Sequence, residues 1–357
     1  MQKLKNRYSM QILIFVLCAL LLANAGQAEE RQAVVLMYHH FGVDKHPSTN
    51  VRLGQFEAHL DHLAEAGYQV WPLERVVEYL RDNKPFPARV VAITVDDAYR
   101  SVYTEAFPRM RERGWPFTVF VSTDGVDRRF QAYMSWEQMR EMQQHNTTFA
   151  SHSASHDYLV QRRKGESETQ WVARIQADIQ RAQRRLREEL GVTTTMFAYP
   201  YGEYDTALAN IVADLGYVAF GQHSGPVGLG NDLRALPRFP MAENFAGLED
   251  FRIKVASLAF PVQEVNPWEP VVTAAVAPRM ELMLGETSAQ LSQMSCYFSA
   301  QGLMQMEWLN REQGHFVVQG NIDLPTGRSR YNCTAPSTEK DRFYWYSHLW
   351  IRPQAVE

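Results

Sequence analysis

Apolar and polar residues follow two different periods along most of the chain, one typical of buried strands and one typical of amphipathic helices. Between about residues 33 and 261, short apolar runs are followed by segments whose apolar positions recur every three to four residues. The predicted strands are 33–38, 89–95, 117–121, 147–151, 195–199 and 217–220. The predicted helices are 55–66, 73–80, 107–113, 136–144, 166–190 and 207–215. Strands that alternate with helices predict a parallel sheet covered by helices, either a barrel or a doubly wound sheet.

The pattern changes in the proline-containing segment 261–270, after which short alternating strands replace helices. A chain of 357 residues is long enough for about two domains. We therefore predict an α/β domain over residues 29–262 and a small all-β accessory module over residues 263–357.

The last predicted strand, 343–351, carries aromatic residues on both of its faces. Strand alternation places Phe343, Trp345, Leu349 and Ile351 on one face, and Tyr344, Tyr346, His348 and Trp350 on the other. One arrangement leaves an aromatic face exposed to stack on sugar rings, and the alternative buries both faces in a small sandwich. Our hypothesis is a carbohydrate-binding or assembly module.

The N-terminal segment 1–28 has the pattern of a secretory signal peptide. Lys3, Lys5 and Arg7 precede an apolar run at 12–23, and small residues continue to Ala28. The run is shorter than the about 20 residues that span a bilayer, although an uncleaved anchor is the alternative. We expect an exported protein, periplasmic or secreted, with no membrane span after cleavage of the signal.

Composition and cysteine content narrow the class of protein. The chain is 45% hydrophobic and 21% charged, as in globular proteins, which excludes wholesale disorder. Its formal net charge of -4 gives no support for a nucleic-acid partner. After signal removal only Cys296 and Cys333 remain, and in an oxidising compartment they most simply form one disulfide; two buried thiols are the alternative.

Four short polar motifs stand where predicted strands end, which is where α/β folds place their active sites. They are Tyr38-His39-His40, Asp96-Asp97, His152-Ser153-Ala154-Ser155-His156 and Tyr199-Pro200-Tyr201-Gly202. Each motif alone has an ordinary explanation as a cap, a turn or a solvated polar segment. Their joint occurrence, each after a strand, favours one chemical site.

The residue types in these motifs suit a metal centre. Two histidines and one carboxylate form a ligand set with open positions for zinc or another divalent first-row metal. One aspartate would bind the metal, and its neighbour would remain free to act as a base. A divalent ion lowers the pKa of water and polarises a carbonyl oxygen. These parts together suit hydrolysis of an acyl group.

On these motifs, residues 34–238 resemble the polysaccharide deacetylase family, also called NodB-homology or carbohydrate esterase family 4 proteins. The resemblance implies a distorted (β/α) barrel and removal of acetyl groups from sugar polymers with a divalent metal, usually zinc. It implies that Asp96 is the catalytic base and that Asp97, His152 and His156 bind the metal.

The resemblance also implies a substrate groove that includes Pro200, Tyr201 and Gly202, with the Tyr201 backbone N–H as an oxyanion donor. The family usually carries an arginine where this chain has Ala198, and we expect Arg238 to supply that charge. We also expect Tyr38 to contribute to substrate binding.

The chain lacks a clear Leu-x-His motif late in the barrel, where the family places its general acid. A subgroup that resembles exopolysaccharide (poly-β-1,6-N-acetylglucosamine) deacetylases has a histidine in a Met-Tyr-His motif on the first strand. Met37-Tyr38-His39 fits that motif, so we expect His39 to be the general acid, with His223 as the alternative.

The leading functional hypothesis is a metal-dependent hydrolase that removes N-acetyl groups from an N-acetylglucosamine-containing extracellular or cell-wall polysaccharide. One alternative is an O-acetyl esterase acting on a polysaccharide such as xylan. Another is a non-catalytic carbohydrate-binding or export protein that retains the fold. The expected partners are the polysaccharide itself and the machinery for its export or synthesis.

Overall fold

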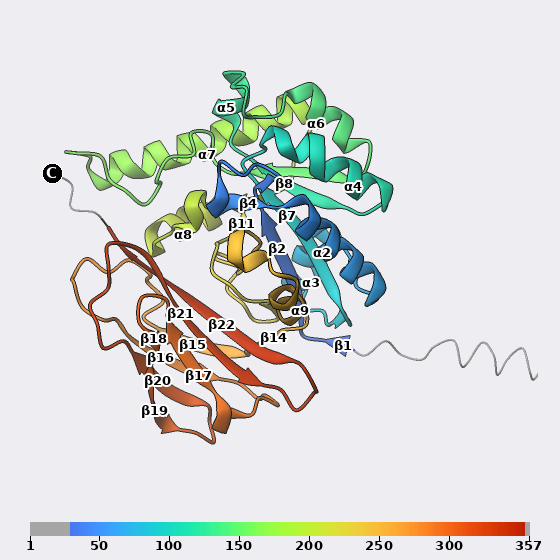
Figure 1. Ribbon diagram of the computed structural model, residues 1–357. Coiled ribbons are helices and arrows are strands. Elements are labelled where there is room, and N and C mark those ends of the chain that lie inside the picture. Colours follow the sequence, from blue (N-terminus) through green and yellow to red (C-terminus); the bar gives the residue numbers. More distant parts are fainter. Residues whose placement is uncertain (1–28, 354–357) are drawn as a thin grey trace, which may run out of the picture.

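The computed structural model describes residues 29–353, so the predicted signal peptide lies outside the described residues. An α/β part and a strand-rich C-terminal part pack side by side (Figure 1). Within residues 29–353, no helix has the length and apolar character needed to cross a membrane.

The α/β part is built on one curled sheet whose main strands run parallel. Its strand order is β11-β10-β9-β8-β7-β2, and β12 (Val227–Gly228) adds to β2 in the antiparallel sense. The parallel strands are β2 (Gln32–Tyr38), β7 (Val90–Asp96), β8 (Phe117–Val121), β9 (Thr147–Ser151), β10 (Met196–Ala198) and β11 (Val218–Phe220). β2, β7 and β8 are buried along their whole length, because helices cover one face and the barrel interior covers the other.

The described α-helices are α2 (Leu53–Glu65), α3 (Leu73–Arg81), α4 (Phe107–Glu112), α5 (Thr123–Asp127), α6 (Trp136–Gln143), α7 (Glu168–Leu190), α8 (Thr206–Asp214) and α9 (Leu248–Val255). Six of them lie close to their predicted positions, and α5 and α9 were not predicted from the sequence. In α7, Ser167 caps the N-terminus by accepting a hydrogen bond from the Gln170 N–H, and Gly191 ends the helix with φ 67°. The predicted fold class, a distorted barrel of alternating strands and helices followed by strand-rich sheets, is confirmed.

A short segment that the sequence pattern does not predict brings the two edges of the curled sheet together. Leu236 forms a parallel bridge with Phe220 of β11, and β13 (Phe239–Pro240) pairs in parallel with β2. Arg238 lies between these two attachments, and its backbone N–H donates to the His223 carbonyl at 3.0 Å. The segment therefore closes the barrel and carries Arg238 to its interior.

The C-terminal part consists of two sheets packed on one core. The first sheet is β14 (Leu258–Ala259), β22 (Phe343–Arg352), β21 (Gly327–Pro336), β17 (Ser295–Phe298) and β18 (Gly302–Leu303). The second sheet is β15 (Val262–Asn266), β16 (Arg279–Leu284), β20 (His315–Gln319) and β19 (Gln305–Asn310). Because β14 already pairs with β22, this sheet begins a few residues before the predicted boundary at 262/263.

β22 is half-buried over residues 343–346 and buried over residues 347–351, so it is neither fully exposed on an aromatic face nor fully buried on both faces. Trp350 packs in the core between the two C-terminal sheets. Leu349 and Ile351 pack instead against residues of the α/β part, and Trp345 contacts Phe239 edge-on with ring centroids 5.2 Å apart. β22 thus contributes side chains both to the core between the two C-terminal sheets and to the packing against the α/β part.

Cys296 and Cys333 form the predicted disulfide, which joins opposite residues of β17 and β21. The cross-link spans 37 residues, so replacing both cysteines by serine should lower the free energy of unfolding of this part by about 3 kcal/mol. Denaturant unfolding checks this expectation. A reductant should shift the midpoint of the wild type and leave that of the double variant unchanged; equal midpoints for the two proteins under oxidising conditions would contradict it.

Candidate active site

Asp97, His152 and His156 converge at the carboxyl ends of the parallel strands. Asp97 directly follows β7, and the two histidines stand in the loop after β9. Asp97 Oδ1 lies 3.4 Å from His152 Nε2 and 3.0 Å from His156 Nε2. The three candidate ligand atoms all lie within 4.8 Å of one another. Residues about fifty positions apart in the chain therefore share one small volume.

The polar atoms of this cluster fit a divalent metal. Asp97 Oδ1 and His152 Nε2 are buried and lack a well-formed hydrogen bond, which would be costly for atoms with no ligand. His152 Nδ1 donates to the Ala198 carbonyl at 2.7 Å, which leaves the lone pair of Nε2 directed at the cluster. One carboxylate and two imidazoles suit zinc and several other first-row metals.

The loop that carries the histidines is held by its own backbone hydrogen bonds. Ser153 Oγ accepts from the His156 N–H at 2.9 Å. Asp178 of α7 accepts from the N–H groups of Ala154 and Ser155, at 3.0 and 3.2 Å. The sequence motifs did not point to Asp178, although an acidic residue directly before Ile179 on the buried face of α7 was a usable signal.

Asp96 forms a fully buried ion pair with Arg238. Two guanidinium nitrogens of Arg238 donate to the two carboxylate oxygens at 2.7 and 2.8 Å, and both side chains are 0% exposed. The same guanidinium donates to the Gly221 carbonyl and to Thr94 Oγ1. Burial raises the pKa of Asp96, but Arg238 and His152 outweigh it and hold the pKa below its ordinary value. Arg238 therefore provides the positive charge expected in place of Ala198.

His39 lies beside this ion pair. Its Nε2 is 4.0 Å from Asp96 Oδ2, and its side chain is 12% exposed. Burial lowers the pKa of His39 despite the opposing effect of the two aspartates. His223, the alternative general acid, lines a separate cavity near His348, where burial lowers its pKa to about 3.

The structure corrects the expected role of Tyr38. Its side chain is 1% exposed, packs between Phe41 and Phe56, and hydrogen-bonds His59 Nδ1 at 3.0 Å. Successive residues of a strand point to opposite faces, so the neighbour of His39 points into the helix-covered core. The Tyr38 side chain is thus not available to a substrate.

Tyr201 forms a wall beside the metal-ligand cluster. It has φ 60°, packs edge-on against His156, and stacks on Tyr158 with ring centroids 3.9 Å apart. Pro200 and Gly202 shape this turn, and a side chain at Gly202 would lie 2.5 Å from Gln222. The sequence motifs did not point to Tyr158.

A second aromatic wall stands next to Asp97. Tyr99 stacks on His40 with ring centroids 3.7 Å apart and on Tyr133 with centroids 5.3 Å apart. Burial and the nearby Asp97 carboxylate raise the pKa of Tyr99 above its ordinary value. Aromatic rings on two sides of a polar centre suit the C–H faces of sugars.

Comparison with known proteins agrees with this geometry. Residues 83–220 match the family model described as "Polysaccharide deacetylase". The chain contains a polysaccharide deacetylase domain. In this domain the matched residues include the Asp96-Asp97 motif and the loop that carries His152 and His156.

The deacetylase domain also has relatives of known sequence and structure. The poly-β-1,6-N-acetyl-D-glucosamine N-deacetylase of Escherichia coli (strain K12) is 25% identical over 253 residues. That alignment covers 61% of this chain but only 37% of the relative, so the chain corresponds to part of that protein.

Two solved structures share the fold. IcaB from Ammonifex degensii is 26% identical with a TM-score of 0.53, and covers 63% of this chain and 97% of its own. The Streptococcus pyogenes deacetylase PplD, solved with acetate, is 24% identical with a TM-score of 0.57, and covers 63% and 98%. In the second case the likeness shows the fold alone.

The buried ion pair yields a prediction about stability. Arg238→Met leaves the Asp96 carboxylate buried without its counter-ion, so the free energy of unfolding should fall by about 3–5 kcal/mol. Denaturant unfolding would measure this fall. Adding Asp96→Asn to Arg238→Met should restore part of the loss, because both charges are then removed. The exposed pair Arg252–Glu249 is the control, and Arg252→Met should cost less than about 1 kcal/mol.

Asp178 yields a prediction about metal binding. Asp178→Asn removes a charged acceptor from two backbone N–H groups of the histidine loop, so metal affinity should fall about 10–100-fold. Competition with a chelating dye measures the affinity. Glu188→Gln, at an exposed acid on the same helix, is the matched control and should leave it unchanged. Equal affinities for Asp178→Asn and the wild type would show that Asp178 does not position the loop.

Proposed function

We propose that the chain is a metal-dependent hydrolase that removes N-acetyl groups from an N-acetylglucosamine-containing polysaccharide. The observation that carries the proposal is the cluster of Asp97, His152 and His156 beside Asp96, a carboxylate kept ionised by Arg238. A metal-ligand set next to a separate base is the combination that amide hydrolysis requires. The E. coli relative named as a poly-β-1,6-N-acetyl-D-glucosamine N-deacetylase supports the class of substrate.

The metal would be held by Asp97, His152 and His156, and we propose zinc. When bound, it would supply a Lewis acid that polarises the amide carbonyl and lowers the pKa of water. The chain's own residues would perform the remaining work, which is to orient the substrate and to move one proton.

Asp96 would act as the base. Arg238 holds both carboxylate oxygens in place and lowers the pKa of Asp96, so the group is ionised and oriented before the substrate arrives. It would take the proton from the attacking water. The backbone N–H of Tyr201 would donate a hydrogen bond to the oxyanion of the tetrahedral intermediate.

His39 would return the proton to the leaving amine. Burial lowers the pKa of His39, so its imidazole starts neutral. Its Nε2 lies 4.0 Å from Asp96 Oδ2, so it could receive the proton that Asp96 has taken and pass it to the sugar nitrogen. His223 remains the alternative acid, and its position in a separate cavity makes it the weaker choice.

We further propose that the protein acts after export, in a periplasm or outside the cell, next to machinery that makes or exports the polymer. The Cys296–Cys333 disulfide supports an oxidising compartment. In this arrangement residues 29–262 form the catalytic domain and residues 263–357 an accessory module. The absence of the family arginine at Ala198 no longer favours a non-catalytic protein, because Arg238 supplies the charge.

Two substitutions separate the base from the metal ligands. Asp96→Asn should lower acetate release by about 10²–10⁴-fold while bound metal stays nearly unchanged, because the lost group is the base. His152→Ala should instead lower metal occupancy. Asp157→Asn, at an exposed acid next to His156, is the matched control and should keep full activity.

The measurement is acetate release from poly-N-acetylglucosamine, chitooligosaccharides, peptidoglycan and acetylxylan, with and without a chelator. We expect chelator-sensitive release from the N-acetylglucosamine polymers. Release from acetylxylan alone would establish the O-acetyl esterase instead. Normal turnover in both the Asp96→Asn and His152→Ala variants would refute the assignment.

A further inference from the structure

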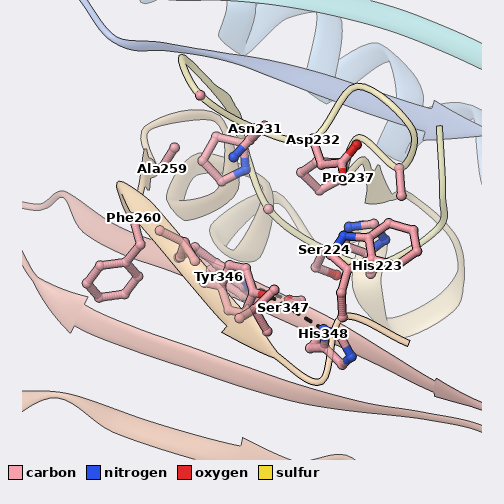
Figure 2. A pocket seen from close by; sticks show the side chains of 18 of the residues that line it. His223, Ser224, Asn231, Asp232, Pro237, Ala259, Phe260, Tyr346, Ser347 and His348 are labelled. Carbon is pink, nitrogen blue, oxygen red and sulfur yellow. Dashed lines mark hydrogen bonds between the residues drawn. The ribbon is translucent and has the colours of Figure 1, made fainter. Parts of the chain in front are cut away.

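A cavity of about 580 Å³ lies between the deacetylase domain and the C-terminal sheets, and of the candidate catalytic residues only His223, the alternative acid, lines it. Figure 2 shows this interface cavity, in which His223 and Asp232 of the deacetylase domain stand across from Tyr346 and His348 of β22. Its volume lies in the range typical of small-molecule sites, roughly 300–1,000 Å³. The interface between the two parts is therefore incompletely filled by protein.

Two imidazoles in the cavity wall have an unused nitrogen. His223 Nδ1 and His348 Nε2 have no hydrogen-bond partner, although the two residues are only 7% and 5% exposed. They come from different parts of the chain and are both neutral, since burial lowers the pKa of each to about 3. A buried polar atom without a partner is unfavourable, and a small rotation of either ring would bring its nitrogen within reach of a ligand hydroxyl or amine in the cavity.

The cavity also borders a part of the β22 edge, around Ser347, whose backbone groups do not pair with another described strand. The Trp345 carbonyl accepts from the Phe260 N–H, and the Ile351 N–H donates to the Pro270 carbonyl, both on the edge away from β21. Backbone groups repeat their direction every two residues, so Ser347 turns its N–H and C=O to the same edge. No strand pairs with β22 there among the described residues, which leaves a donor and an acceptor for a ligand.

The remaining walls favour a saccharide over an anion. Besides Phe260, four aromatic residues line the cavity, and their ring faces suit the C–H surface of a sugar ring. These are Tyr204, Trp268, Trp345 and Tyr346. The lining residues include the acids Asp232 and Glu264 but neither lysine nor arginine. Asp232 is already paired with Arg234, whose guanidinium lies 4.4 Å from the Trp268 ring centroid, so the walls are close to neutral and suit an uncharged sugar ring.

We propose that the interface cavity binds one hexosamine unit, N-acetylated or with a free amine, of the polysaccharide on which the neighbouring catalytic site acts. The chemistry of the cavity supports a sugar ring by itself, and the identity of the polymer rests on the proposed function.

The cavity and the catalytic centre share the segment that closes the barrel. Pro237 lines the cavity, and the next residue, Arg238, holds Asp96. The His223 carbonyl, at the cavity wall, accepts the Arg238 N–H. A polymer that reaches both sites gains affinity by linking two binding events, so long chains should bind more tightly than short ones.

Fluorine NMR of the full chain labelled with fluorotryptophan tests the proposal at the site itself. Titration with β-1,6-linked oligosaccharides of glucosamine and of N-acetylglucosamine should shift the resonances of Trp268 and Trp345. Trp308 of β19, outside the cavity, is the internal reference and should not move.

His348→Phe is the decisive variant, because it removes the unpartnered nitrogen and keeps a ring of similar size. It should weaken binding read at Trp268 about tenfold. Tyr297→Ala, at an exposed aromatic of the same sheet, is the matched control and should bind as the wild type does. Thermal unfolding of each variant establishes that it is folded. Ser347→Pro removes the backbone N–H at the open edge of β22, so this second variant should also weaken binding.

The outcomes separate this proposal from the proposed function. Unmoved Trp268 and Trp345 resonances at millimolar oligosaccharide, with normal acetate release, would overturn the cavity proposal alone. So would equal binding by His348→Phe and the wild type, or binding only of an anionic oligosaccharide such as oligogalacturonate. Shifts at Trp268 that His348→Phe abolishes, without any acetate release, would support the cavity and refute the deacetylase activity.

Discussion

The ion pair between Asp96 and Arg238 links the chemistry of the site to the closure of the barrel. Neither charge would be stable alone at 0% exposure, and the pair is held by two short hydrogen bonds. The guanidinium also donates to the Gly221 carbonyl, directly after β11, and to Thr94 Oγ1 within β7. The interaction that keeps the proposed base ionised thus also fixes the segment that joins the two edges of the sheet.

Much of the α/β part could be predicted because its signals are local. The buried strands and the long helix α7 have periodic apolar positions and clear caps, and the structure moves their ends by only one or two residues. The motifs after β7 and β9 were recognisable for the same reason. Parallel strands place their carboxyl ends at one edge, so the three candidate ligands meet without any further information.

What could not be predicted depends on contacts between distant segments. Asp96 and Arg238 are 142 residues apart, and only the closing segment around Leu236 explains how they meet. The role of Asp178 depends on how α7 crosses the histidine loop. Tyr38 is a different case, because strand alternation alone already places its side chain on the face opposite to that of His39.

Arg328 of β21 reaches across to the deacetylase domain, where its Nη1 donates to the Tyr201 carbonyl and its Nε lies 3.5 Å from Glu203 Oε1. β22, the last strand described, covers the apolar flank of the same domain. During synthesis the barrel would therefore expose that flank until the final strand has emerged. The deacetylase domain and the C-terminal sheets would then mature together, and loss of the last strand would disturb both the catalytic groove and the apolar surface that shields the domain.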